Sequence, residues 1–287
     1  MESVIAMGIG VLFAVVAVAG MLLYVMVRRH RRGREERVAQ LIRAVEDVHA
    51  EHVSFAILDG LPAPVARYFR YVLVDGQARI RLATYRQAGE IRLDPAAQKW
   101  LRFDATQWVT HAPVAFVWDA KIHLAPAFHV RVTDAFLAGS GSGEVALQSA
   151  IVVAREQNQP QLNAGELYRY LAEAPWHPTS LLPEAGVRWQ AVDANTAIAH
   201  LECYGMTVSV EFRFNTVGEI TSIYTADRYG RFDGDYVKRP WEGFFDNYQL
   251  IDGMRIPTEG RVGWHLPAGW WLFWKGTLVD VAFEYYQ

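Results

Sequence analysis

The residues best suited to chemistry lie together in the stretch GELYRYLAEAPWHP, residues 165–178. Glu166 and Glu173 are seven residues apart, so a helix would place both carboxylates on one face, as acid–base catalysis requires. Arg169 lies between them, three and four residues away, and could pair with either carboxylate. The segment therefore predicts either a polar site that orients a ligand or a helix with ordinary local ion pairs, and the second reading is the commoner one in proteins.

Aromatic and imidazole side chains extend this candidate site. Exposed ion pairs contribute only about 0.3–0.5 kcal/mol each, so stability alone does not explain the segment. If the charged side chains of the segment were instead buried over a cavity, they would orient a ligand. We therefore predict seven ligand-binding candidates: Glu166, Arg169, Tyr170, Glu173, Trp176, His177 and, in the strand-like stretch FVWDA, Trp118.

The sequence excludes other kinds of functional site or gives them only weak support. The chain has 28 Lys and Arg against 31 Asp and Glu, which gives no positive field for nucleic acid. The single Cys203 cannot form an intrachain disulfide or a zinc cluster. GSGSGE, residues 139–144, lacks the lysine of a phosphate-binding loop, and DRYGRFDGDY lacks the glutamate of a calcium loop. We predict no catalytic triad, no metal and no cofactor.

The candidate site must be positioned by a helix, which we expect over residues 164–174. Asn163 could cap this helix, with Glu166 completing a variant of the capping box. Pro175 should end it, because the residue before a proline avoids helical geometry.

Most of the remaining chain alternates with the period of strands. Beyond Gln77 the alternation predicts strands near residues 80–82, 101–103, 116–124, 128–132, 145–153, 187–192, 197–203, 207–215, 219–229, 255–265 and 277–286. The run at 138–144 is expected to be a flexible turn. This spacing favours an antiparallel sheet interrupted by one helix, an α+β fold.

The N-terminus predicts a membrane helix. Residues 4–27 carry no charge and would extend about 36 Å as a helix, enough to cross a hydrocarbon core. A cleaved signal peptide is the alternative, since Ala17-Val18-Ala19 resembles a cleavage site. The arginines that follow place the soluble part in the cytoplasm by the positive-inside rule, with the periplasm as the alternative.

Two groups of side chains could lie at the membrane surface. The first is the basic flank, with Arg28, Arg29, Arg31 and Arg32. The second is the aromatic run GWWLFWKG, with Trp270, Trp271 and Trp274, although some of these rings could instead line the inner face of the last hairpin.

These patterns divide the chain into three parts. Residues 1–34 form the anchor and its basic flank. Residues 35–76 form a helical connector, in which 35–52 is amphipathic and 61–73 is a second short helix. Residues 77–287 form one antiparallel β-rich domain that contains the helix at 164–174.

Several blocks together carry a family resemblance. These are LPAPVARYF, RQAG at 86–89, FDATQWV, FVWDA, FLAGSGSGE, GELYRYLAEAPWHPTSLLP and FRFNTVGEI. The chain resembles a family of bacterial membrane-anchored proteins of unknown function, and it is similar to the lipoprotein-carrier (LolA/LolB-like) half-barrels. The second resemblance implies a curled, unclosed antiparallel sheet around an apolar cavity that helices close. It also implies a lipid-like ligand, but the chain departs from those carriers by its membrane helix and by the lack of a lipid-attachment cysteine.

The resulting functional hypothesis is a binding protein anchored in the bacterial inner membrane by residues 4–27. Its ligand would be lipid-like or otherwise hydrophobic and would lie in the half-barrel cavity. One alternative is a structural or assembly role with a protein partner, which the sequence does not identify. The other, ranked last, is a hydrolase-type enzyme that uses Glu166 and Glu173.

Overall fold

One curled antiparallel sheet dominates the computed structural model, which describes residues 2–45 and 52–286, with side chains from residue 14 onward. In that part of the chain the sheet has 13 strands, in the order β6-β5-β4-β3-β2-β1-β13-β12-β11-β10-β9-β8-β7. The strands are β1 Ile80–Ile91, β2 Leu101–His111, β3 Val114–Ala125, β4 Phe128–Leu137, β5 Ser140–Leu147, β6 Ile151–Gln157, β7 Val187–Asp193, β8 Thr196–Cys203, β9 Met206–Phe214, β10 Ile220–Phe232, β11 Asp235–Ile251, β12 Met254–Leu266 and β13 Gly269–Tyr285.

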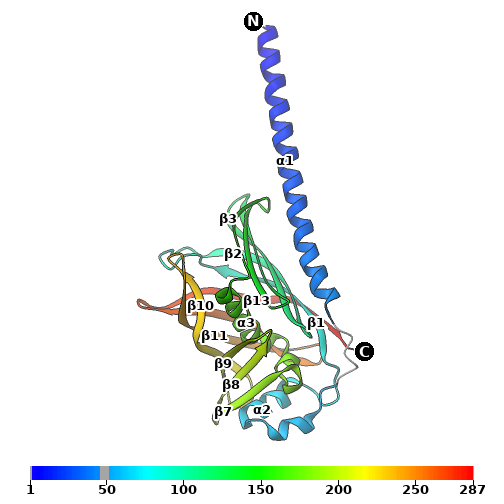
Figure 1. Cartoon of the computed structure of the whole chain (residues 1–287), viewed down its shortest axis with the longest axis vertical. Coiled ribbons are helices and arrows are strands. Elements are labelled where there is room, and N and C mark those ends of the chain that lie inside the picture. The colour runs from blue at the N-terminus through cyan, green and yellow to red at the C-terminus, as the bar shows by residue number, and fades with distance from the viewer. Residues whose placement is uncertain (1, 46–51, 287) are drawn as a thin grey trace.

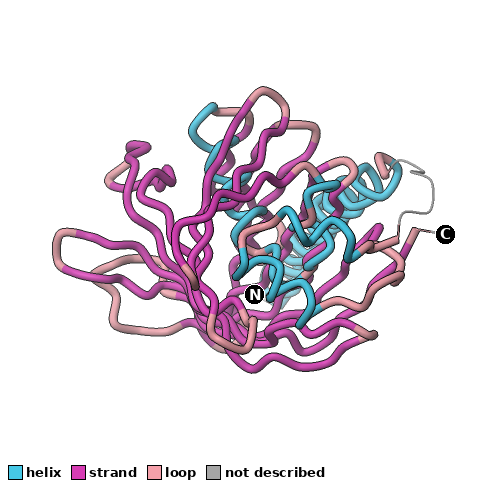
Figure 2. Tube along the Cα trace, turned by 90° about the horizontal axis from the view of Figure 1, so that it is seen from below, coloured by secondary structure: helices cyan, strands magenta, loops and turns pink. Residues whose placement is uncertain are grey.

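The sheet is an unclosed half-barrel around helix α3 (Pro160–Ala172). Its first and last strands, β1 and β13, pair with each other in the middle of the sheet. Its two edges, β6 and β7, do not pair, and the chain between them forms α3 and three short turns of 3₁₀ helix, η2 Ala174–Trp176, η3 Pro178–Leu181 and η4 Pro183–Ala185. Figure 2 shows the strands curving around the helices. The expected fold class, a curled antiparallel sheet with an inserted helix, is confirmed.

Helix α3 begins earlier than the sequence suggested. Pro160 occupies the first helical turn after Gln159, and the N-cap makes no side-chain hydrogen bond, so the predicted Asn163 cap is wrong. Asn163 Oδ1 instead accepts a hydrogen bond of 2.8 Å from the amide of Gly141 on β5. The helix ends at Ala172, because Pro175 forces the chain into the 3₁₀ turn that follows.

The glycine-rich run is a strand, not the expected turn. Residues 140–147 form β5, and α3 lies directly against it. A Cβ atom at Gly141 would come within 3.0 Å of the Leu162 carbonyl oxygen, so the glycines allow close contact between helix and sheet. The expected strand at 145–153 is divided by a turn in which Gln148 and Ser149 have positive φ. Strand β11 was missed, since Pro240 and its many charges hide the alternation.

The N-terminal helix α1 (Glu2–Arg43) is continuous, so the expected membrane segment and the first part of the amphipathic helix belong to one element. Its C-terminal part packs on the convex face of the sheet, where Val38 and Leu41 meet Leu82, Val117 and Ala135. In Figure 1 the N-terminal part extends away from the sheet. Among the described residues no helix is long and apolar enough to cross a membrane. Of the expected span 4–27, the side chains of residues 4–13 lie outside the described part, as do residues 46–51 of the expected connector.

The lower end of the half-barrel is filled by η1 (Phe55–Gly60) and α2 (Ala63–Val72), as Figure 1 shows for α2. The prolines at the start of α2 suit a first helical turn, which confirms the second short helix expected from the sequence. Tyr68 and Phe69 are fully buried, and the Tyr68 ring contacts Phe214 on β9. Because η1 and α2 occupy this end, α3 covers the remaining part of the concave face.

Candidate ligand-binding cavity

A cavity of about 460 Å³ lies between α3 and the concave face of the sheet. Strands from both halves of the half-barrel line it: β1 and β3 to β6 on one side, and β10 to β13 on the other. Most of its wall is apolar, and aromatic rings form much of it: Trp118, Trp176, Tyr229, Tyr236, Trp241, Phe244, Phe245, Trp264, Phe273 and Trp274. A cavity of this size and composition is typical of sites for small hydrophobic molecules.

Two β-bulges shape the wall. On β10, the four residues from Thr225 to Arg228 lie opposite the three residues from Arg239 to Trp241 of β11. This one extra residue shifts the alternation before Arg228, which lines the cavity. On β13, Phe273 is the extra residue opposite β12, and both Phe273 and the adjacent Trp274 face inward. Without these bulges, strict alternation would direct neighbouring side chains to opposite faces.

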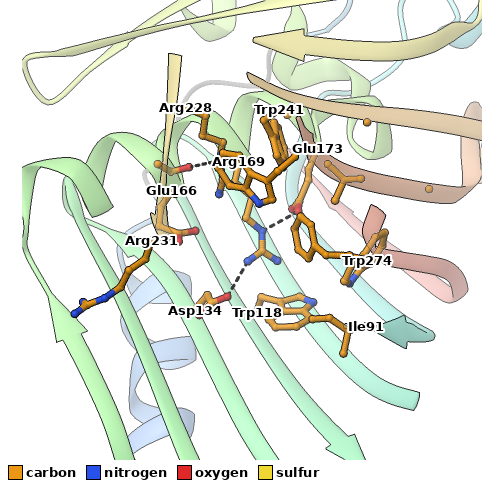
Figure 3. A pocket seen from close by; sticks show the side chains of 18 of the residues that line it. Ile91, Trp118, Asp134, Glu166, Arg169, Glu173, Arg228, Arg231, Trp241 and Trp274 are labelled. Atoms are coloured by element: carbon orange, nitrogen blue, oxygen red, sulfur yellow. Dashed lines mark hydrogen bonds and ion pairs between the residues drawn. The ribbon is translucent and has the colours of Figure 1, made fainter. Parts of the chain in front are cut away.

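Arg169 is held between two carboxylates at the centre of the site. Its Nε donates to Glu173 Oε1 at 2.8 Å, and its Nη1 donates to Asp134 Oδ2 at 3.0 Å (Figure 3). Its guanidinium carbon lies 4.9 Å from the centre of the Trp118 ring. Burial opposes the charge, but Glu173 and Asp134 more than offset this effect and raise the pKa of Arg169. The cation is therefore fixed in place and fully compensated.

A chain of amide hydrogen bonds continues from Glu173 into the sheet. Gln107 Nε2 donates to Glu173 Oε2 at 2.7 Å, and Gln87 Nε2 donates to Gln107 Oε1 at 3.0 Å. Trp118 Nε1 donates to Gln87 Oε1 at 2.8 Å. Both oxygens of Glu173 are thus engaged, which fixes the carboxylate and makes it a poor candidate for proton transfer.

Glu166 differs from the other carboxylates of the site. It lines the cavity but is only 8% exposed, and its Oε2 has no hydrogen-bond partner among the described residues. Burial is the main reason why its pKa rises to about 7, and the neighbouring Asp134 adds to the effect, while Arg169 and Arg228 oppose it. Glu166 can therefore exchange a proton near neutral pH and can serve as a hydrogen-bond donor in its neutral form.

Arg228 supplies the second cation. Its Nε donates to the carbonyl of Gly165 at 3.2 Å, and its guanidinium carbon lies 4.5 Å from the centre of the Trp241 ring and 5.0 Å from that of Trp264. In the described part of the chain, no carboxylate lies within ion-pair distance of it. Burial lowers the pKa of Arg228 to about 10, although Glu166 acts in the opposite direction. Arg228 is thus a buried cation whose charge is only partly compensated.

The structure divides the ligand-binding candidates into two groups. Glu166, Arg169, Glu173, Trp176 and Trp118 line the cavity. Two others do not.

Tyr170 and His177 pack together behind the helix, with ring centres 5.7 Å apart. His177 Nδ1 lies 3.1 Å from the hydroxyl of Tyr85, and burial lowers the pKa of His177 to about 3, so its ring is neutral. These two side chains belong to the packed core and not to the cavity wall.

The aromatic run of β13 is also divided. Trp274 lines the cavity and stacks on Phe103, with ring centres 5.7 Å apart. Trp270 is 38% exposed and packs edge-on against Phe244. Trp271 is partly buried beside Phe273. The arginine candidates, Arg28, Arg29, Arg31 and Arg32, lie exposed on α1.

Four polar residues of the site were missed by sequence reasoning: Gln87, Gln107, Asp134 and Arg228. Gln87 and Gln107 stand in the blocks RQAG and FDATQWV, and polar residues at inward positions of strands were a usable signal. Arg228 carried no such signal, because the bulge that directs it inward is invisible in the alternation.

Solved structures offer two comparisons. A LolA superfamily protein from Nitrosomonas europaea is similar with a TM-score of 0.35 and 11% identity, covering 78% of this chain and 94% of that one. A DUF1329 family protein from Desulfovibrio piger is similar with a TM-score of 0.34 and 12% identity, covering 80% and 92%. No curated protein matches the chain.

Family comparison covers most of the described domain. The match extends over residues 51–276, which include α2, α3 and every residue that lines the cavity. The chain belongs to the family of unknown function DUF6544.

Proposed function

We propose that this protein binds a lipid-like ligand in the cavity, with the apolar part of the ligand against the aromatic wall and its polar end at Glu166 and Arg228. The observation that carries this proposal is the buried Oε2 of Glu166, which has no hydrogen-bond partner among the described residues although Glu166 lines the cavity. An unpaired buried polar atom costs about 1–3 kcal/mol, a cost that a ligand group would remove.

Glu166 and Arg228 define the chemistry of the polar end. Neutral Glu166 donates a hydrogen bond, and Arg228 donates from a partly compensated guanidinium. A carboxylate or another acidic group would accept from both, and a single acyl chain would fit a cavity of about 460 Å³. An acidic, single-chain amphiphile such as a fatty acid is therefore the ligand class that the geometry supports best.

A membrane tether would give such a protein access to its ligand. Residues 14–26 of α1 expose large apolar side chains, including Val15, Met21 and Leu22, and form no contacts that would bury them. Together with the uncharged sequence over residues 4–27, this supports a membrane segment that is followed by the cytoplasmic domain. The inner membrane of a bacterium is the location that this arrangement implies.

Lipid analysis of the purified full-length protein tests the proposal. The protein is transferred from detergent to amphipol, which contains no free fatty acid, and bound molecules are extracted and identified by mass spectrometry. Binding is then measured with a fluorescent fatty acid. We expect a stoichiometric amphiphile, or saturable binding of the fluorescent probe after delipidation.

Two variants make this test specific to the cavity. Val132 lines the cavity, and Val132→Trp would fill part of it and reduce binding. Leu250 is 66% exposed on β11, so Leu250→Trp adds a comparable side chain outside the cavity and should leave binding unchanged. Equal binding by both variants, or no binding by the parent protein, would contradict the proposal.

A further inference from the structure

A second pocket, separate from the cavity, lies between α1 and the edge of the sheet. It has a volume of about 420 Å³, and its basic side chains come from two elements. Arg29, His30, Arg34 and Arg37 lie on α1, and Arg155 lies on the edge strand β6. The only acidic side chain that lines it, among the described residues, is Glu144 on β5.

The charges of this pocket do not balance. Glu144 interacts with His30 Nδ1 at 3.2 Å, with Arg37 Nη2 at 3.2 Å and with Arg155 Nη2 at 2.6 Å. With four arginines and one carboxylate in the lining, three positive charges remain uncompensated.

Asp119, beside the pocket, does not change this excess. It is shared between Arg34, at 3.2 Å, and Arg131, at 2.6 Å. Arg34 Nη1 remains buried without a hydrogen-bond partner in the described part of the chain. Burial is the main reason why the pKa of His30 is lowered; Glu144 opposes this effect, and Arg34, Arg155 and Arg37 add to it. An anion would therefore complement the charges of this pocket.

Apolar side chains of α1 and of the edge strand also line the pocket. Met26 and Val152 line the pocket and are both partly exposed. Ile151 and Val153, which flank Val152 on the edge strand, also expose large apolar side chains. The pocket thus combines a basic part with an apolar part, directly after the apolar residues 4–27. An anionic amphiphile would match both surfaces at once.

We propose that this pocket binds the phosphate group of an anionic phospholipid, whose acyl chains lie along Met26, Val152 and the apolar part of α1. Guanidinium groups bind phosphate through paired, charge-assisted hydrogen bonds, and Arg29, Arg34 and Arg155 have donors to offer. Such a lipid would join α1 to the edge strand and hold the domain at the membrane surface. The proposal does not require the cavity to be occupied.

Binding of soluble lipids to the full-length protein in a neutral detergent tests this site. Three probes are compared: short-chain phosphatidylglycerol, short-chain phosphatidylcholine and inorganic phosphate. All are measured in the Val132→Trp background, so that binding in the cavity contributes less. We expect phosphatidylglycerol to bind about tenfold more tightly than phosphatidylcholine, and this difference to decrease with salt, as screening of exposed arginines requires.

Variants locate the binding. Arg29 and Arg155 are exposed enough to be replaced without disturbing the fold, whereas Arg34 holds the buried Asp119. Arg29→Gln combined with Arg155→Gln should weaken phosphatidylglycerol binding about tenfold. Arg32→Gln removes an exposed arginine of the same helix that does not line the pocket, and it should have no effect.

Three results would overturn the proposal. Equal weakening by Arg32→Gln would indicate a diffuse basic surface. Equal affinity for phosphatidylcholine would show that the charge excess is not what selects the ligand. Inorganic phosphate that binds as tightly as phosphatidylglycerol would indicate a free-anion site instead of a lipid site. Loss of fatty-acid binding in the cavity, by contrast, would affect only the proposed function.

Discussion

Arg169 and Asp134 join the helix that closes the cavity to the wall of the half-barrel, through a hydrogen bond of 3.0 Å between Nη1 and Oδ2. Arg169 belongs to α3 and Asp134 to β4, so this contact fixes the helix relative to the sheet. The same guanidinium binds Glu173, and loss of Arg169 would therefore leave two poorly solvated carboxylates without their cation.

Arg169→Met should lower the free energy of unfolding by about 3–5 kcal/mol, because removal of one partner leaves buried charges uncompensated. Arg169→Met combined with Asp134→Asn should recover part of this loss, since only Glu173 then remains unpaired. Urea titrations of Arg169→Met, Asp134→Asn and the double variant measure the coupling. Arg261→Met is the control, because it removes an ion pair with Asp246 that is exposed on both sides and contributes less than about 1 kcal/mol. Similar losses in the two arginine variants would contradict the structural role of Arg169.

Glu166 should make stability depend on pH. Its pKa is raised from 4.5 to about 7 in the folded protein, so between these values the folded state holds a proton that the unfolded state has lost. Stability therefore falls as the pH rises from about 4.5 to about 7 and stays at the lower level above that range. Because a tenfold difference in proton affinity corresponds to about 1.4 kcal/mol, the total change is on the order of 3 kcal/mol.

Glu166→Gln removes this contribution and isolates it from other titrating groups. The parent protein should lose stability between pH 5 and pH 8, whereas the variant should not. The free energy of unfolding of the variant, relative to that of the parent protein, should therefore be higher at pH 8 than at pH 5, and urea titrations at the two pH values measure this difference. Asp134, Arg169 and Glu173 surround Glu166, together with Arg228 from β10, and all of them stay unchanged in this comparison. Parallel pH profiles for the two proteins would show that Glu166 titrates normally.

The packing of α1 on the convex face should depend on Leu41. This side chain is fully buried against Leu82, Val117 and Ala135. Leu41→Ala should destabilise the docked helix by about 2–5 kcal/mol, the usual cost of a cavity in a packed cluster. Hydrogen exchange of the amides in residues 30–43 reports this loss directly, because the helix can separate while the sheet stays folded.

Ile42 provides the matched control. It follows Leu41 in the same helix but is 39% exposed, so Ile42→Ala should change exchange in residues 30–43 only slightly. Equal effects of the two substitutions would indicate that α1 does not dock on the sheet in solution.

The sequence predicted the sheet and the inserted helix because alternation and helical periodicity are local signals. Ile80, Leu82, Phe116 and Trp118 alternate as strands require, and the segment around Arg169 has a helical pattern. The helix start was misplaced because Asn163 has a tertiary partner, Gly141, that local capping rules do not include.

The site was predicted only in part, because its polar residues come from distant parts of the chain. Glu166, Arg169 and Glu173 are close in sequence and were found together. Asp134 and Arg228 reach them through the curl of the sheet and a β-bulge, and neither feature leaves a local pattern. Long-range register, which decides what faces the cavity, is set by pairings that no single segment specifies.

The close approach of α3 to β5 should depend on Gly141. A Cβ atom at this position would lie 3.0 Å from the Leu162 carbonyl oxygen and 3.1 Å from the Asn163 backbone, so Gly141→Ala must displace the helix. We expect a loss of about 1–3 kcal/mol in the free energy of unfolding, together with weaker binding of the fluorescent fatty acid, because α3 carries Glu166.

Gly143 lies on the same strand, and its substitution tests whether contact with α3 causes the loss of stability. A Cβ atom there would meet only Asp134 Oδ1, at an ordinary distance of 3.5 Å. Gly143→Ala should therefore be neutral or slightly stabilising, by up to about 1 kcal/mol, since alanine restricts the unfolded chain more than glycine does. If both substitutions destabilised the protein equally, general strand flexibility, and not the contact with α3, would explain the glycines of β5. If only Gly141→Ala weakens ligand binding, the position of α3 controls the cavity.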